Sequence, residues 1–191
     1  MQQKPYHHGN LRSDLIEAGI ELIREQGLTG FSLRKVAGKC GVSHAAPYAH
    51  FKDVDDLVQA MGKHVTERFT EKLRASVEGF GDGEAIHQLG RAYVEFFVEH
   101  PNYFTFLFYY SGMTIDIDQE NPDEYPPFAV FRETACRLFR LMNLPESEHA
   151  KNLAALWSLV HGAASLLTND CIRYGGDWRD IFSSSFLGKG D

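Results

Sequence analysis

The side chains best suited to binding chemistry lie in the segment SHAAPYAHFK, residues 43–52. Four of them can donate hydrogen bonds to an anionic partner: His44, Tyr48, His50 and Lys52. Ala45 and Ala46 lie among these donors and are small enough to let a partner come close to the backbone. Because the segment holds few large apolar residues, it can bury little surface. We therefore expect its function to depend on the side chains of its exposed face.

Two short helical patterns position this segment. Ser32 is a candidate N-cap for the first, and Gly41 can take the left-handed conformation that ends it. Ser43 is a candidate N-cap for the second, and Pro47 falls near its start, where the missing N–H forfeits about one backbone bond. The apolar residues expected to fix the crossing of the two helices are Leu33, Val36, Ala37, Val42 and Phe51.

Two short helices around a tight turn form a helix-turn-helix, whose second helix enters the major groove of DNA. Small side chains at Ala45 and Ala46 allow close approach to the bases, where an alanine can touch a thymine methyl. Tyr48, His50 and Lys52 suit phosphates. The alternative is a small turn inside a helical bundle with a solvated face.

The rest of the chain also has helical spacing and almost no strand signals, which predicts an all-α protein. A first helix begins after a candidate N-cap at Asn10 and ends at Gly27, and Asp53 is a candidate N-cap for a long helix over residues 54–77. The later helices are expected at residues 84–99, 101–111, 127–142, 146–174 and 178–187. The acidic, proline-bearing segment 112–127 is predicted to be a mobile surface loop.

Composition limits the class of protein. With 191 residues, 43% of them hydrophobic, the chain can bury a core as one domain or two small ones. No apolar run approaches the roughly 20 residues of a membrane span, and the polar start does not suit a secretory signal, so we expect no membrane partner and a cytoplasmic location. The three cysteines are far apart and are expected to be reduced and buried.

Charge is distributed unevenly along the chain. The net charge is -7, which by itself argues against nucleic acid. Residues 1–63, however, carry 8 Lys and Arg against 7 Asp and Glu, whereas residues 64–191 carry 11 against 19. The first third is therefore the electropositive end, a modest asymmetry that agrees with a DNA-binding segment there.

The stretch SLRKVAGKCGVSHAAPYAHFKDVDDLV resembles the DNA-binding segment of the TetR family of one-component transcriptional regulators, with a match from about Leu11 to Val65. The residues at the family's spacing are Ala37, Gly41, Val42, Ser43, Tyr48, His50, Phe51, Lys52 and Leu57. Pro47 departs from the aliphatic residue that many members have there. The resemblance implies a homodimer that binds a pseudo-palindromic operator and usually represses, with the later helices supplying a ligand pocket and the dimer interface.

On this basis we expect three functional parts. Residues 1–53 form the DNA-binding domain, the helix over residues 54–77 links it to the rest, and residues 54–191 form the ligand-binding and dimerisation domain. The expected DNA-binding residues are Ser32, Arg34, Ser43, His44, Ala45, Ala46, Tyr48, His50 and Lys52.

The carboxy-terminal part offers a second, weaker resemblance. LWSLVHGAASLL is similar to the Trp-His-Gly signature of one TetR subfamily, with Trp157, His161 and Gly162 in its places. The helix that holds it and the last helix are expected to form a two-fold four-helix interface, to which Ile181, Phe182 and Phe186 contribute.

Aromatic residues are dense just before that segment. Residues 90–131 hold 12 of the 24 Phe, Tyr and Trp residues. A hydrophobic pocket for a small aromatic or amphipathic molecule and a packed aromatic core would both have this composition. The candidate ligand-binding residues are Tyr93, Phe97, Tyr103, Phe104, Leu107, Phe108, Trp157 and His161.

Enzymatic chemistry has little support in the sequence. The nine histidines are scattered, and no metalloprotease, serine-hydrolase or phosphate-loop motif occurs, so we predict no catalytic residue, metal or cofactor. The adjacent His7 and His8 fit a flexible flank near the DNA backbone better than a metal site. Two alternatives remain open: a DNA-binding regulator controlled by a protein partner or by abundance, and, more remotely, a helical-bundle enzyme.

Overall fold

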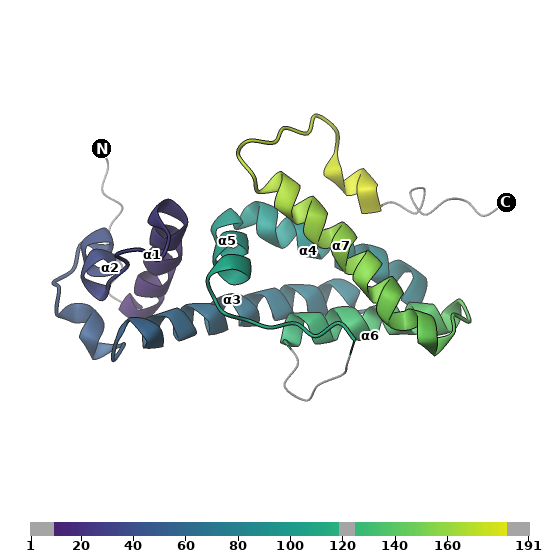
Figure 1. Ribbon diagram of the computed structural model, residues 1–191, viewed down its shortest axis with the longest axis horizontal. Coiled ribbons are helices and arrows are strands. Elements are labelled where there is room, and N and C mark those ends of the chain that lie inside the picture. The colour runs from purple at the N-terminus through teal and green to yellow at the C-terminus, as the bar shows by residue number, and fades with distance from the viewer. Residues whose placement is uncertain (1–9, 119–124, 183–191) are drawn as a thin grey trace. The chain divides into compact units, whose positions relative to one another are not determined.

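The computed structural model describes residues 10–118 and 125–182 (Figure 1). All regular elements in these two ranges are helical: seven α-helices and three short 3-10 helices. The all-α prediction is therefore confirmed. His7, His8 and Phe186 lie outside the described residues.

The described residues fall into two compact units. The first contains the described part of Met1–Val65 together with Thr105–Gly112, and the second contains Thr66–Phe104 together with the described part of Met113–Asp191. Two helices, α3 (Val54–Val77) and α5 (Pro101–Tyr109), contribute residues to both.

Local capping chemistry sets the first two helices. In α1 (Leu11–Gln26), the Asn10 side chain accepts a hydrogen bond from the Ser13 N–H at 3.4 Å. In α2 (Leu33–Cys40), Ser32 Oγ accepts from the Lys35 N–H at 3.3 Å. Gly41 ends α2 with φ +69°, in the left-handed region that an L side chain rarely adopts. These predicted starts and stops are confirmed.

The second helix of the predicted pair is not an α-helix. It is the single 3-10 turn η1 (Ala46–Ala49), its N-cap position is Ala45, and no side chain caps it. Pro47 is the cause: it has no N–H to donate to the Ser43 carbonyl, which accepts from Ala46 instead at 3.0 Å. The prediction that Ser43 caps an α-helix was therefore wrong.

The start of α3 is held by two aspartates. Asp53 Oδ1 accepts a hydrogen bond from the Asp56 N–H at 2.9 Å, as the predicted N-cap requires. Asp56 Oδ2 in turn accepts from the Lys52 backbone N–H at 2.9 Å. This reciprocal pair fixes the direction in which the chain passes from η1 into α3.

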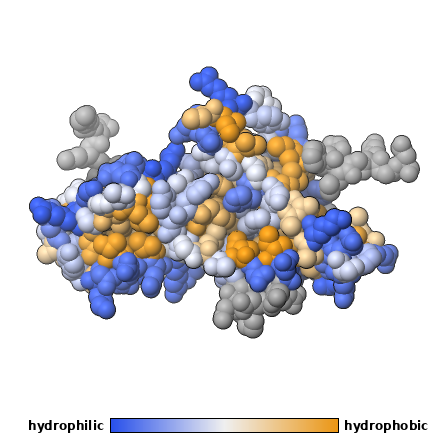
Figure 2. All heavy atoms as spheres, viewed as in Figure 1, coloured by the Kyte–Doolittle hydropathy of each residue, from blue (hydrophilic) through white to orange (hydrophobic). Residues whose placement is uncertain are grey.

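In the second unit, α4 (Asp82–Glu99) packs against α6 (Pro126–Leu141) and α7 (His149–Leu167), as the ribbon in Figure 1 shows. The 3-10 helix η2 (Glu146–Glu148) leads into α7, and η3 (Trp178–Phe182) lies against α4. On the face drawn in Figure 2, hydrophobic side chains form separate patches bordered by hydrophilic residues.

Two of the predicted carboxy-terminal helices were too long. The one expected at 146–174 ends at Leu167, where Thr168 Oγ1 donates to the Ala164 carbonyl at 2.8 Å. Asn169 Oδ1 then accepts from the Cys171 N–H at 2.9 Å, so these side chains compete with continued helix formation. The helix expected at 178–187 is a 3-10 helix up to Phe182, and residues 183–187 lie outside the described part of the chain.

The cysteines are free thiols, but they are less buried than predicted. Cys171 is exposed because it lies in the irregular segment after α7, and Cys40 and Cys136 are half-buried. Cys40 Sγ lies 3.5 Å from the Asp14 carbonyl oxygen. Within residues 10–118 and 125–182, none of the helices combines the length and apolarity that a bilayer crossing needs.

Candidate functional site

The recognition segment, residues 43–52, presents polar side chains on a small and firmly held turn. His44, Tyr48, His50 and Lys52 are all exposed, and Tyr48 has 62% of its surface accessible. Ala45 is exposed as well, whereas Ala46 is half-buried. The predicted outward face is therefore present in the structure, although it is built on a 3-10 turn.

Two buried residues anchor the recognition segment from below. Pro47 is buried, and its carbonyl accepts from the N–H groups of His50 and Phe51, each at 2.9 Å. Phe51 is 1% exposed, and the Arg12 guanidinium lies over its ring, 5.3 Å from the centroid. The exposed side chains thus belong to a turn whose position is set by packing.

Sequence reasoning missed Arg12. It is exposed, it lies in the first turn of α1, and its cation–π contact with Phe51 brings its charge to the base of the recognition segment. No local pattern relates residues 12 and 51; only the tertiary fold of the first unit brings them together. Arg12 is therefore a candidate phosphate-binding residue.

Two further predicted residues lie at the start of α2. Ser32 is half-buried and uses its hydroxyl oxygen to cap the helix, and Arg34, two residues further on, is exposed. The neighbouring Lys35 reaches back to Gln26, with Nζ 3.3 Å from Oε1. Arg34 is thus an exposed cation in the first turn of α2.

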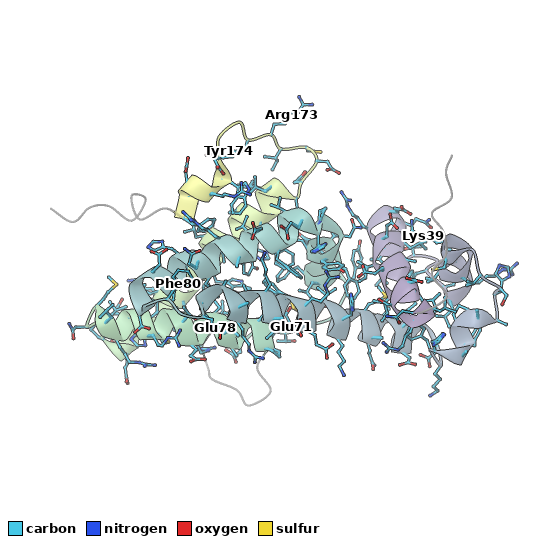
Figure 3. The ribbon with its side chains drawn as sticks, turned by 180° about the vertical axis from the view of Figure 1, so that it is seen from behind. Lys39, Glu71, Glu78, Phe80, Arg173 and Tyr174 are labelled. Carbon is cyan, nitrogen blue, oxygen red and sulfur yellow. The ribbon has the colours of Figure 1, made fainter. Side chains whose placement is uncertain are left out.

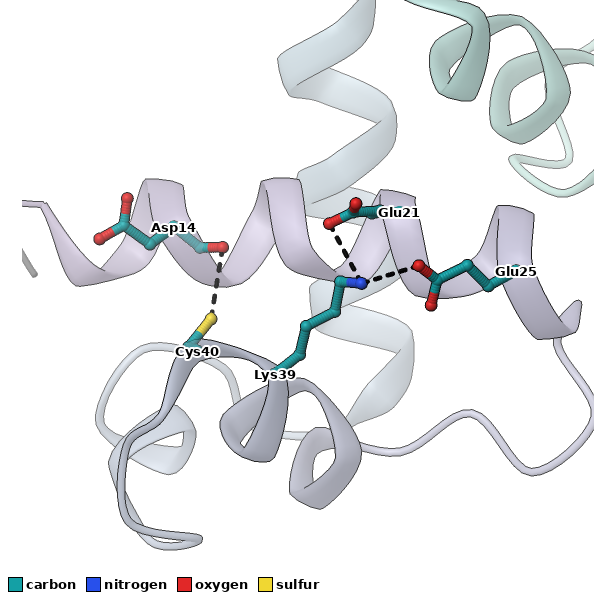
Figure 4. Close-up of polar contacts among 5 residues, drawn as sticks. All are labelled: Asp14, Glu21, Glu25, Lys39 and Cys40. Carbon is teal, nitrogen blue, oxygen red and sulfur yellow. Dashed lines mark hydrogen bonds and ion pairs between the residues drawn. The ribbon is translucent and has the colours of Figure 1, made fainter. Parts of the chain in front are cut away.

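Lys39 does not add to this positive surface. Its Nζ lies 2.9 Å from Glu25 Oε1 and 3.1 Å from Glu21 Oε2, and both carboxylates belong to α1 (Figure 4). Burial lowers the pKa of Lys39, but hydrogen bonds to Glu25 and Glu21 outweigh that effect and leave the pKa raised. Lys39 therefore ties α2 to α1, and the count of basic residues in the sequence overstates the charge that is available.

Six of the eight candidate ligand-binding residues lie in the second unit, which contains a dense aromatic cluster. We define this aromatic cluster by its members: Phe69, Tyr93, Phe96, Phe97, Phe104, Trp157 and His161. Tyr93 and Phe97 are fully buried, with ring centroids 5.3 Å apart in an edge-to-face arrangement. Leu107 and Phe108 belong to the first unit.

The polar groups of the aromatic cluster already contact one another. The Tyr93 hydroxyl lies 3.2 Å from His161 Nδ1. Burial raises the pKa of Tyr93 and lowers the pKa of His161, so both side chains are neutral at pH 7 and the hydroxyl can donate to the ring nitrogen. Tyr103, next to the cluster, accepts a hydrogen bond from Arg68 Nη1 at 2.8 Å.

Two cavities of the second unit lie elsewhere, and neither is lined by any of the eight candidates. One is an apolar cavity of about 50 Å³ between α4, α6, α7 and η3, with Gly90, Phe131 and Phe182 in its wall. Ligand pockets usually measure about 300–1,000 Å³, so this cavity cannot hold a drug-sized molecule without opening. The other is a wider and more polar cleft of about 470 Å³.

In the described part of the chain, His, Cys, Asp and Glu form no group of three or more that could hold a metal ion.

Curated relatives match the amino-terminal part. The nicotine-responsive transcriptional repressor HdnoR of Paenarthrobacter nicotinovorans is 33% identical over 75 residues, which is 39% of each chain. The transcriptional regulator CymR of Pseudomonas putida is 33% identical over 86 residues, 44% of this chain and 42% of that protein. Each match therefore spans about two fifths of the relative's length.

Solved structures share the fold over nearly the whole chain. A Rhodococcus sp. RHA1 protein of unknown function aligns with a TM-score of 0.68 at 22% identity, covering 94% of this chain and 93% of that one. The regulator FadR of Bacillus subtilis, in complex with stearoyl-CoA, gives a TM-score of 0.66 at 14% identity, covering 89% and 92%.

Two family models divide the chain between them. One, described as bacterial regulatory proteins of the tetR family, matches residues 15–61 and so includes the recognition segment. The other, described as a tetracyclin repressor-like C-terminal domain, matches residues 86–185, more than half of the sequence. The chain therefore belongs to the tetracycline repressor-like (TetR) family of transcriptional regulators.

Proposed function

We propose that this regulator binds a pseudo-palindromic operator as a homodimer, represses transcription there, and leaves the operator when a small hydrophobic or aromatic molecule binds the second unit. The observation that carries the DNA-binding part is the recognition segment. Its donors are exposed while Pro47 and Phe51 beneath them are buried, so the turn presents a fixed polar surface to a groove.

We assign recognition of the bases to the residues at the start of η1. His44 and Ala45 are exposed there, one as a hydrogen-bond donor or acceptor and the other as a small apolar contact for a thymine methyl. Ala46, which is half-buried, keeps the backbone close to the bases. Substitutions at His44 should therefore change base preference.

We assign phosphate binding to the residues on either side of this base-reading surface. Tyr48, His50 and Lys52 can donate to phosphates on one side, and the cation of Arg12 lies beside them. The remaining proposed contacts are Ser32, Arg34 and Ser43. These contacts fix the register of the protein on the duplex without reading its sequence.

The proposed functional boundaries follow from this assignment. Residues 1–53 form the DNA-binding domain, and residues 54–191 form the domain that binds the effector and the second copy. The helix α3 is continuous over Val54–Val77 and links the two. Because its target is chromosomal DNA, we propose that the protein works in the cytoplasm without a membrane partner.

The dimer interface is proposed to form on α7 and η3, as in the Trp-His-Gly subfamily to which Trp157, His161 and Gly162 point. Ala155, Ser158 and Leu166 are exposed along one side of α7, which supports close approach by another helix. Phe182 is 5% exposed and packs so closely on Gly90 that a Cβ there would lie 2.8 Å from its ring. We therefore assign Phe182 to packing within the chain and Ile181 to the interface.

The effector site is proposed in the aromatic cluster, where the Tyr93–His161 pair would orient a neutral ligand by hydrogen bonding. Two similarities support small-molecule control: HdnoR is named as nicotine-responsive, and FadR was solved with stearoyl-CoA. Because the rings of the cluster contact one another, ligand entry requires them to separate, and this movement would favour the arrangement that does not bind DNA.

A regulator without a small-molecule effector is the second candidate. The burial of Tyr93, Phe97 and Phe104 favours it, since a filled interior has no room for a ligand. Control would then come from a protein partner or from abundance.

Operator binding is tested by selecting bound duplexes from random DNA and titrating the winners at two salt concentrations. We expect an inverted repeat with half-site centres about one or two helical turns apart, and an affinity that falls steeply with salt. Equal affinity for selected and random DNA at low salt would refute the function. Light scattering without DNA should give a dimer, and a monomer at micromolar concentration would refute the proposed assembly.

A further inference from the structure

The cleft of about 470 Å³ in the second unit has the composition of a binding site that the aromatic cluster does not explain. We call it the cationic cleft. Its walls come from the end of α3, the middle of α4 and the start of η3, and Lys72, Phe80, Arg91, Glu95, Trp178 and Arg179 line it. Its volume lies within the range of pockets that hold small molecules.

Positive charge exceeds negative charge on the lining. Three cationic side chains face a single carboxylate, Glu95, which pairs with Lys72 at 2.7 Å. Outside the lining, Asp177 lies 3.4 Å from Arg179 Nη1. These pairings leave one excess positive charge in the cleft, which matches a single anionic group.

Arg91 is the cation with unused bonding capacity. Its Nε is buried and has no hydrogen-bond partner, although a buried donor normally has one. Because Nε is covered by protein, a carboxylate in the cleft would instead accept from the two terminal nitrogens of the Arg91 guanidinium, a bidentate geometry that arginine favours. An incoming anion would therefore pair with the charge of Arg91.

Aromatic surface lies next to this charge. Trp178 contributes its indole, over which the Arg179 guanidinium lies 4.7 Å from the ring centroid. Phe80 follows the end of α3 (Figure 3), and its side chain is 48% exposed. A ligand with a flat apolar body could therefore contact Phe80 and Trp178 while its charged end reaches Arg91.

We propose that the cationic cleft binds a small aromatic carboxylate, with the carboxylate on Arg91 and the ring between Phe80 and Trp178. This site shares no lining residue with the aromatic cluster, whose Tyr93–His161 pair is neutral and suits an uncharged ligand. The proposal concerns binding by the second unit alone, so it does not depend on operator binding.

The test titrates the full chain with naphthoate, with its uncharged isostere naphthamide and with inorganic phosphate, by calorimetry and by tryptophan fluorescence. We expect naphthoate to bind and the other two to bind at least about tenfold more weakly, because only naphthoate carries both the charge and the ring. The chain has two tryptophans, so Trp178→Phe should remove the fluorescence response while Trp157 still emits.

Arg91→Gln should weaken naphthoate binding more than about tenfold. Arg91→Lys should restore part of the affinity, because lysine keeps the positive charge but lacks the two parallel N–H donors of the guanidinium. Arg74→Gln is the matched control, because Arg74 is an exposed cation on α3 outside the cleft and its loss should leave affinity unchanged. If Arg91→Gln does not fold, Phe80→Ala serves instead, because Phe80 is 48% exposed and its loss should weaken naphthoate binding by removing a ring contact while changing packing little. Equal binding of naphthoate and naphthamide, or equal losses from Arg91→Gln and Arg74→Gln, would overturn the proposal.

Discussion

The recognition segment and the aromatic cluster use aromatic and histidine side chains in opposite ways. In the recognition segment, Tyr48 is 62% exposed and its neighbours face solvent, and burial is left to the two anchors beneath the turn. In the aromatic cluster, Tyr93 is fully buried and its hydroxyl already has a partner in His161. The same residue types therefore expose hydrogen-bonding groups in one region and fill the interior in the other, and burial distinguishes the two.

The largest effect should come from removing a ring of the aromatic cluster. Phe97→Ala deletes a fully buried ring that contacts Phe69, Tyr93 and Phe104, so the free energy of unfolding should fall by about 3–5 kcal/mol. Chemical denaturation monitored by circular dichroism measures this loss. A loss under about 1 kcal/mol would mean that the cluster is loosely packed and can open for a ligand.

Tyr48→Ala is the partner experiment in the recognition segment. Because most of Tyr48 is exposed, stability should change by no more than about 0.5 kcal/mol, while affinity for the selected operator falls. The two variants would then separate packing from binding. A large loss of stability in Tyr48→Ala would contradict the assignment of Tyr48 to the DNA surface.

Two lysines sharpen the comparison within the first unit. Lys52→Ala should reduce operator affinity to a similar degree for all sequences and lower the slope of log affinity against log salt by about 1, because a phosphate contact is lost. Lys39→Ala should leave that slope unchanged, since Glu21 and Glu25 already hold its ammonium group. Fluorescence anisotropy at several salt concentrations measures both slopes, and equal slope changes would refute the distinction.

His44→Ala tests the opposite case, a residue proposed to contact a base and not a phosphate. It should alter preference at particular base pairs and leave the salt slope nearly unchanged, because a base contact releases no counterion. Selection from random duplexes with the variant reports the new preference. An unaltered preference would move base reading away from His44.

Helix caps were predictable from the sequence where the chemistry was local. Asn10, Ser32 and Asp53 each accept from an N–H three residues further on, and a sequence pattern contains that relation. Ser43 has the same type and spacing but caps no α-helix, because Pro47 removes the N–H that would bond its carbonyl. The segment nevertheless exposes the predicted polar side chains His44, Tyr48, His50 and Lys52, while Pro47 and Phe51 are buried.

Contacts between distant residues could not be predicted in this way. Lys39 pairs with carboxylates of α1 that are 14 and 18 positions earlier in the sequence, and Arg12 meets Phe51 only through packing. Ile172 and Tyr174 were predicted to lie in the helix over residues 146–174, but both are exposed beyond Leu167, where α7 ends. Aromatic density likewise has the same sequence pattern whether the rings enclose a cavity or fill it.

Ser32 and Ser43 test whether a capping residue predicted from sequence actually caps a helix, with a smaller expected effect. Ser32→Ala removes a cap that accepts from the Lys35 N–H, so stability should fall by about 1 kcal/mol. Ser43→Ala should change stability by much less, because the N-cap position of η1 is Ala45 and has no side-chain bond. Thermal denaturation compares them, and an equal loss in both would restore the α-helical interpretation of the recognition segment.

The smallest effect should come from protonating His161. Burial lowers its pKa in the folded protein below the value of 6.5 that it has when unfolded, so the unfolded chain binds the proton more readily. The stability that follows from keeping this ring neutral is fully present above about pH 6.5 and is lost as the pH falls from there through the folded pKa.

His161→Gln keeps a hydrogen-bonding group near the Tyr93 hydroxyl but cannot titrate, so its unfolding free energy should fall less than that of the wild type between pH 7 and pH 5. If His161→Gln and the wild type lose stability in parallel over this range, His161 is not held neutral by the aromatic cluster, and its proposed role as an uncharged partner for an effector fails with it.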